Sequence, residues 1–195
     1  MTRVALCGVE DPSHEVQELY HAVRQVSDSV SRDADRQLRK VDNKLPQMWR
    51  ALAHSPPIGH WIVRDSKAFF TETSWTTDNP RLRQIVVLTL AKRLNSEVVF
   101  RWHAELAESL GVPQEKIAIL LDSVERAKTS SAFEQAERLL ISFADEIVTT
   151  WQVRDEIFRD VLQRYGTKSA IEISAFLAFY VSVISLCNVL GVEED

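Results

Sequence analysis

The sequence is poor in the residues that make turns and crosslinks. Its 195 residues include five glycines, six prolines and two cysteines. So few Gly and Pro argue against a loop-rich, all-β protein. Cys7 and Cys187 stand near opposite ends of the chain, without the spacing of a redox pair or a zinc site. We therefore expect free thiols in a reducing compartment, which indicates a cytoplasmic protein.

The common catalytic and targeting motifs are also missing. The sequence contains no glycine-rich phosphate loop, no HExxH and no GxSxG, which removes the commonest nucleotide-binding, metalloprotease and serine-hydrolase interpretations. The apolar run in MTRVALCGVEDP is too short for a secretory signal. The formal net charge is −5 and Lys and Arg do not gather in one stripe, so we do not expect nucleic acid as a partner.

Apolar residues recur at helical spacing, which predicts an all-α fold. Residues 27–43 are charge-rich and predict a solvated or mobile helix. Residues 170–190 are apolar but include Glu172 and Asn188, which favours a buried or interface helix over a membrane span. We predict an N-terminal helical extension over residues 1–43 and a helical domain over 44–195, together one compact domain. The other expected helices cover residues 12–26, 45–53, 58–72, 81–94, 97–110, 113–121, 133–150, 154–165 and the segment after Gly166.

His103 is the titratable residue that stands out, in the segment NSEVVFRWHAELAESLG. It shares the apolar face of a predicted helix with Val99, one turn earlier, and Ser96, two turns earlier. Glu97 and Arg101 lie beside that face, where a surface ion pair is their simplest role. A histidine beside a carboxylate can move a proton at neutral pH. The structural alternative is a buried neutral histidine that bonds a backbone carbonyl.

Most of the chain from residue 44 to residue 192 resembles the carboxymuconolactone decarboxylase and AhpD-like family. The resemblance is carried by LPQMWRALAHSPP, by NPRLRQIVVLTLAKRLNSEVVFRWHAELAESLGV, by the amphipathic helix from Phe133 and by FYVSVISLCNVLGV. It implies an AhpD-like helical bundle that forms homotrimers or homohexamers, with pockets near the subunit contacts.

The resemblance also implies which chemistry to expect. Peroxidase-like members of the family carry Cys-x-x-Cys followed by His, with a Glu one helix earlier. These positions match Ser96, Val99, His103 and Gln84 here, so only the histidine is kept. Disulfide-based peroxide reduction needs a thiolate, which neither Ser nor Val supplies. We therefore do not expect a CxxC peroxidase.

Decarboxylase-like members typically read E-Y-x-W-x-x-H, and this sequence keeps Glu97 and His103 of that string. By resemblance we predict His103 as proton donor and acceptor, Glu97 as the group that orients it and Arg101 as a contact of the substrate carboxylate. No metal or cofactor is expected, because the substrate itself can act as the electron sink. The further candidates for substrate binding are His60, Trp75 as a lid, Phe100, Tyr180 and Asn188.

The predicted function is a cofactor-independent decarboxylase, a lyase for a small carboxylated lactone, β-keto or aromatic polyketide-type acid from secondary metabolism or aromatic catabolism. An isomerase, dehydratase or cyclase would use the same His and Glu. The non-enzymatic alternative is an oligomeric binding protein whose pocket has lost its chemistry.

Overall fold

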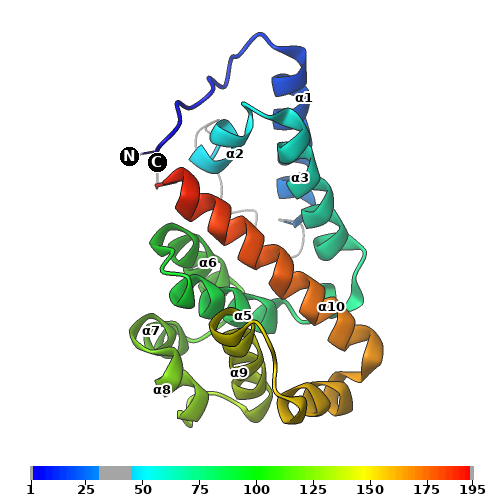
Figure 1. Cartoon of the computed structure of the whole chain (residues 1–195), viewed down its shortest axis with the longest axis vertical. Coiled ribbons are helices and arrows are strands. Elements are labelled where there is room, and N and C mark those ends of the chain that lie inside the picture. The colour runs from blue at the N-terminus through cyan, green and yellow to red at the C-terminus, as the bar shows by residue number, and fades with distance from the viewer. Residues whose placement is uncertain (1, 31–44, 194–195) are drawn as a thin grey trace. The chain divides into compact units, whose positions relative to one another are not determined.

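The computed structural model describes residues 2–30 and 45–193, and every regular element in these stretches is an α-helix (Figure 1). The all-α fold class is therefore confirmed. The helices are α1 (His14–Val30), α2 (Gln47–Leu52), α3 (Pro56–Thr71), α4 (Ser74–Asp78), α5 (Pro80–Arg93), α6 (Glu97–Ser109), α7 (Gln114–Asp122), α8 (Val124–Thr129), α9 (Gln135–Thr150) and α10 (Asp155–Leu190).

The chain divides into two compact units, and each is described by itself. Unit 1 comprises Met1–Glu72 and Leu186–Asp195, and unit 2 comprises Thr73–Ser185. The boundary expected after residue 43 stays a prediction, because residues 31–44 lie outside the described part of the chain. The C-terminal turn belongs with the N-terminal segment because Arg3 N–H donates to the Leu190 carbonyl oxygen over 2.8 Å.

Unit 1 is built on the packing of α1 against α3. Gly59 of α3 permits this close approach, because a Cβ at this position would lie 2.5 Å from Leu19 Cδ2 and 2.8 Å from Leu19 Cδ1. Leu19 is fully buried, so its side chain has little room to move. The apolar core of the unit consists of Val16, Leu19, Tyr20, Val23, Leu45, Ala53 and Val63.

Unit 2 is organised around α5, which contacts α4, α6, α7, α8 and α9. Every residue of α5 from Arg83 to Ala91 is buried. A helix buried on all sides must satisfy its polar side chains internally. Thr89 Oγ1 donates to the Ile85 carbonyl over 2.8 Å, and Arg83 Nη1 donates to the Thr76 carbonyl over 2.9 Å.

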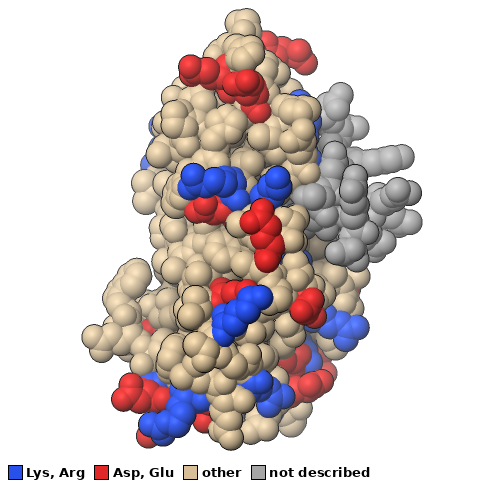
Figure 2. All heavy atoms as spheres, turned by 90° about the vertical axis from the view of Figure 1, so that its right-hand side faces the viewer, with Lys and Arg blue, Asp and Glu red and all other residues tan. Residues whose placement is uncertain are grey.

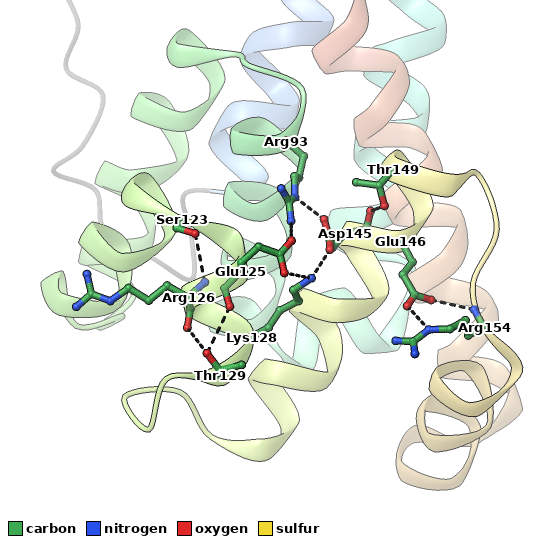
Figure 3. Close-up of polar contacts among 10 residues, drawn as sticks. All are labelled: Arg93, Ser123, Glu125, Arg126, Lys128, Thr129, Asp145, Glu146, Thr149 and Arg154. Atoms are coloured by element: carbon green, nitrogen blue, oxygen red, sulfur yellow. Dashed lines mark hydrogen bonds and ion pairs between the residues drawn. The ribbon is translucent and has the colours of Figure 1, made fainter.

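A charged cluster joins α5, α8 and α9 at the end of α5 (Figure 3). Asp145 of α9, 6% exposed at its side chain, pairs with Arg93 and, over 2.7 Å, with Lys128; Glu125 pairs with both cations. Burial by itself would lower the pKa of Lys128, but hydrogen bonds to Asp145 and Glu125 raise it overall. Hydrogen bonds from Lys128 and Arg93 lower the pKa of Glu125. Lys128 and Glu125 are therefore charged at neutral pH.

α10 is interrupted at Gly166, whose φ of 77° and ψ of 168° are not helical. The predicted end of a helix at this glycine is thus confirmed, because only glycine adopts such angles without strain. α10 is also long and apolar enough, by length and composition alone, to cross a membrane, and 39% of its most apolar stretch is buried. Core helices of soluble proteins pass the same test, so this is weak evidence for a span.

The charged side chains on the surface are mixed in sign. On the described part of the face in Figure 2, Lys and Arg alternate with Asp and Glu rather than forming one basic stripe. This agrees with the scattered Lys and Arg of the sequence.

Most predicted helices are present with ends shifted by a few residues. Three elements differ locally from the prediction: the start of α3, the helix α4 and the helix α8. Pro56 begins α3 instead of merely ending the helix before it, because proline suits the first helical turn. The polar segment 73–79 contains the short helix α4, and α8 was not predicted. Much of the solvated helix predicted over 27–43 lies outside the described residues.

Gly59→Ala should destabilise the protein by about 1–2 kcal/mol, because overpacking against the buried Leu19 outweighs the better helix propensity of alanine. Urea unfolding followed by circular dichroism measures the change. Gly8→Ala is the matched control: its Cβ would meet only backbone atoms at 3.9 Å, so stability should hardly change. Equal stability of both variants would show that α1 and α3 do not pack this closely.

Asp145→Asn should lower the free energy of unfolding by about 2 kcal/mol. The substitution removes the most buried carboxylate of the cluster. Its two partners, Arg93 and Lys128, are only 25% and 23% exposed at their side chains and would lose a buried opposite charge. Asp122→Asn breaks an ion pair with Arg126 whose partners are more than 60% exposed, and should change stability by less than about 0.5 kcal/mol. Similar losses in both variants would contradict the structural importance of the Asp145 cluster.

Candidate functional site

The turn between α5 and α6 sets the orientation of the candidate site. Asn95 adopts a left-handed conformation with φ 53°, and its N–H donates to the Lys92 carbonyl over 3.2 Å. Ser96 N–H donates to the Ala91 carbonyl over 2.9 Å, which completes a Schellman-type helix end. The same Ser96 is the N-cap of α6. This three-residue connection, Leu94 to Ser96, folds α6 back onto α5.

His103 and Gln84 meet where these two helices pack together. His103 Nδ1 lies 2.7 Å from Gln84 Oε1, and Gln84 is 1% exposed. Because an amide oxygen can only accept, Nδ1 must carry the hydrogen of this bond. Neutral His103 then presents a lone pair at Nε2, and charged His103 presents an N–H there. The bond therefore favours the neutral tautomer that carries its hydrogen on Nδ1.

Aromatic rings from α10 pack beside His103. The Tyr180 ring lies 5.3 Å from the imidazole, centroid to centroid, at an interplanar angle of 78°. Phe176 and Phe179 pack on Tyr180 at centroid distances of 4.7 Å and 5.6 Å. Trp75 continues this row, 6.3 Å from Phe176. The rings give His103 an apolar neighbourhood on this side.

The two positions matching the family's redox cysteines are buried on the same face of α6 as His103. Ser96 and Val99 are each 2% exposed. Among the described residues, Ser96 Oγ has no hydrogen-bond partner. This hydroxyl also makes no capping bond to the first turn of α6, although serine commonly does so as an N-cap.

The residues predicted beside His103 on α6 differ in exposure. Glu97 and Arg101 are exposed, whereas Phe100 is 6% exposed. Glu97 is six residues before His103, which places it about 120° around the helix from the imidazole. The recorded side-chain partner of His103 is Gln84 instead. A catalytic role for Glu97 stays a prediction.

Trp75 is a buried residue of α4 and not an exposed lid, because it is only 2% exposed. Glu172 of α10 fixes the start of α4: its Oε2 accepts from Trp75 N–H over 2.7 Å and from the Ser74 hydroxyl over 3.3 Å. The Trp75 ring packs edge-on against Tyr165. Trp75 therefore stands behind Phe176 as part of the aromatic row.

Two predicted binding residues belong to unit 1, whereas His103 belongs to unit 2. Asn188 lies in the last turn of α10, where its carbonyl accepts from Gly191 N–H. His60 of α3 lines a shallow surface depression together with His14, Gln17, Glu18 and His21. Within the described chain, no three His, Cys, Asp or Glu side chains converge where a metal ion could sit.

Sequence reasoning did not assign a role to two buried polar residues of α5. Gln84 was noted only as a replacement for the family's Glu, yet it is the partner of His103. Arg83, 6% exposed, was overlooked. Their position in an otherwise apolar helix is the sequence feature that indicates a role, because a buried polar side chain needs a partner inside the protein.

The cysteines are both in unit 1, so residues 73–185 contain none. Burial raises the pKa of Cys187 to about 12, and burial raises that of Cys7 as well. Both are free thiols, as expected, and at neutral pH both are almost wholly protonated.

Comparison with known proteins identifies the architecture. A cysteine-to-alanine variant of the debrominase Bmp8, in complex with 2,3,4-tribromopyrrole, superposes with a TM-score of 0.72 at 15% identity, over 100% of this chain and 92% of that one. Apo Bmp8 gives a TM-score of 0.69 at 15% identity, over 93% and 88%. The chain has the AhpD-like all-α fold. No family model and no curated protein sequence matches it.

Gln84→Glu should raise the pH at which His103 becomes half-protonated by about one unit or more, because a carboxylate beside Nδ1 stabilises the imidazolium. NMR of ¹⁵N-labelled histidine measures this, and in the parent protein should also show hydrogen on Nδ1 of the neutral ring. Gln135→Glu adds the same charge at an exposed position and should leave His103 unchanged. A neutral ring with hydrogen on Nε2 would contradict the His103–Gln84 bond.

Proposed function

We propose that this chain is a cofactor-independent enzyme that transfers a proton on a small organic acid. The observation that carries the proposal is the 2.7 Å contact between His103 Nδ1 and the buried Gln84 Oε1, which orients the imidazole where α5 and α6 pack together. An amide adds no charge beside the ring, so this contact by itself does not hold the imidazole in its charged form.

Two further observations support proton transfer over thiol chemistry. Unit 2, which holds His103, contains no cysteine. The aromatic row of Trp75, Phe176 and Tyr180 suits a small, flat organic molecule. A solved protein of the same fold, the debrominase Bmp8, was crystallised with 2,3,4-tribromopyrrole, a molecule of that shape.

The specific reaction that we propose is decarboxylation of a small carboxylated lactone, β-keto or aromatic polyketide-type acid. The bond from the carboxylate to the α-carbon breaks, CO₂ leaves, and the electron pair moves through the carbon skeleton onto the carbonyl oxygen. The enolate then re-forms its carbonyl as its carbon takes the proton from His103 Nε2. Neutral His103, still bonded to Gln84 through Nδ1, regains a proton from water. The substrate is the electron sink, so the step balances without an oxidant or reductant.

We also propose that copies of the chain associate as trimers or hexamers, as the resemblance implies. Large apolar side chains that remain exposed, including Leu121 and Ile171, support such contacts. Their exposure in a single chain is the expected state of an interface before assembly.

His103→Ala should reduce release of CO₂ from the best of a panel of β-keto, lactone and hydroxybenzoic acids by at least about 100-fold, because it removes the proton donor. A coupled bicarbonate assay measures the rate. His103→Gln provides a second variant if the alanine variant fails to fold, and His21→Ala, at an exposed position of α1, is the control that should keep full activity. Turnover by a folded His103 variant at the parent rate would refute the proposal.

A further inference from the structure

Ser96 carries a buried polar group with no assigned purpose. Its side chain is 2% exposed, and among the described residues its Oγ has no hydrogen-bond partner. Buried hydroxyl groups are nearly always hydrogen-bonded, and leaving one unbonded destabilises a fold. The unpartnered hydroxyl of Ser96 is therefore able to bond a water molecule or a ligand from outside the chain.

The Ser96 hydroxyl lies at the N-terminus of α6, where the first backbone N–H groups of the helix are further hydrogen-bond donors. Ser96 is the N-cap of this 13-residue helix, but its side chain makes no capping bond. The first intrahelical bond recorded at this end is from Phe100 N–H to the Ser96 carbonyl, over 3.0 Å. By helix geometry, the N–H groups of Val98 and Val99 have no partner within the helix. Both residues are buried, at 8% and 2% exposure.

Together these donors favour an anionic oxygen. A helix N-terminus carries partial positive charge and presents N–H groups in one direction. The Ser96 hydroxyl adds a third donor that a bound oxygen can accept from. Glu97 is exposed and so does not occupy this buried position.

His103 and Ser96 lie on one face of α6, seven residues and so about 10 Å apart along the axis. Side chains of a helix lean towards its N-terminus, which brings the imidazole closer to Ser96. Val99 lies between them on the same face and provides an apolar surface. One small molecule can therefore place an oxygen at Ser96 and a carbon atom at His103.

We propose that Ser96 Oγ and the N–H groups of Val98 and Val99 form an oxyanion site for the carbonyl oxygen that becomes an enolate oxygen in the reaction. This inference rests on the proposed proton transfer by His103. Binding the enolate oxygen accelerates decarboxylation, because the negative charge there develops only as CO₂ leaves. Binding the carboxylate at the same donors would instead stabilise the starting acid, so the carbonyl oxygen is the better occupant.

The test uses 4-nitrophenolate, a flat oxyanion, as a probe that does not depend on turnover. The full-length protein should bind it, as followed by its absorbance, in preference to neutral nitrobenzene. Ser96→Ala should weaken phenolate binding about tenfold, the effect of one hydrogen bond to a charged oxygen, and leave nitrobenzene binding unchanged. Ser109→Ala makes the same change at the other end of α6, where Ser109 Oγ donates to the Leu106 carbonyl, and should leave phenolate binding intact.

Stability separates a binding role from a structural one. Because the Ser96 hydroxyl is unpartnered, Ser96→Ala should keep or raise the thermal unfolding midpoint, whereas loss of a true helix cap would lower it. Unchanged phenolate affinity in Ser96→Ala, or no binding of phenolate by the parent protein, overturns the oxyanion site. His103→Ala should keep phenolate binding. If phenolate binding depends on Ser96 but no acid is decarboxylated, the proposed reaction fails while the oxyanion site stands.

Discussion

The burial of α5 on all sides is the constraint on which unit 2 depends. Five other helices contact it, so nine consecutive residues from Arg83 to Ala91 are removed from water. A segment of this kind has to be apolar, or each of its polar groups has to be bonded inside the protein. The side chains of Gln84 and Thr89 are bonded in this way, and Arg83 is bonded through Nη1. The bond of Gln84 is the one that gives His103 a fixed orientation.

The same packing explains the contrast between the two ends of α5. At the C-terminal end, Arg93 reaches a partly exposed cluster in which every charge has an opposite partner, and this cluster holds α8 and α9 in place (Figure 3). Near its N-terminal end α5 carries two arginines, Arg81 and the buried Arg83, and no carboxylate. Beside this part of α5, His103 contacts the neutral amide of Gln84 and the ring of Tyr180. The C-terminal end of α5 thus contributes to the stability of the unit, and the part around Gln84 contributes to the proposed reaction.

The AhpD-like fold is retained at 15% identity to solved debrominase structures because the fold depends on a pattern more than on particular residues. Helices of matching length with apolar faces at the same spacing pack in the same way with many combinations of side chains. The chemistry has no such tolerance. The hydroxyl of Ser96 fits a backbone turn as a thiol would, but it supplies a hydrogen-bond donor and not a thiolate nucleophile.

The sequence by itself determined the helical class, the helix ends at Asn79-Pro80, Gly111 and Gly166, and His103 as the residue to examine, because periodicity and capping are local properties. It also directed attention to Ser96 and Val99, through their spacing from His103. Only the tertiary structure decided which polar group meets the imidazole. Glu97 is near His103 in sequence but about 120° around the helix, whereas Gln84, nineteen residues away, is 2.7 Å from the ring. Partners across a helix interface depend on how two helices rotate against each other, and no single helix encodes that rotation.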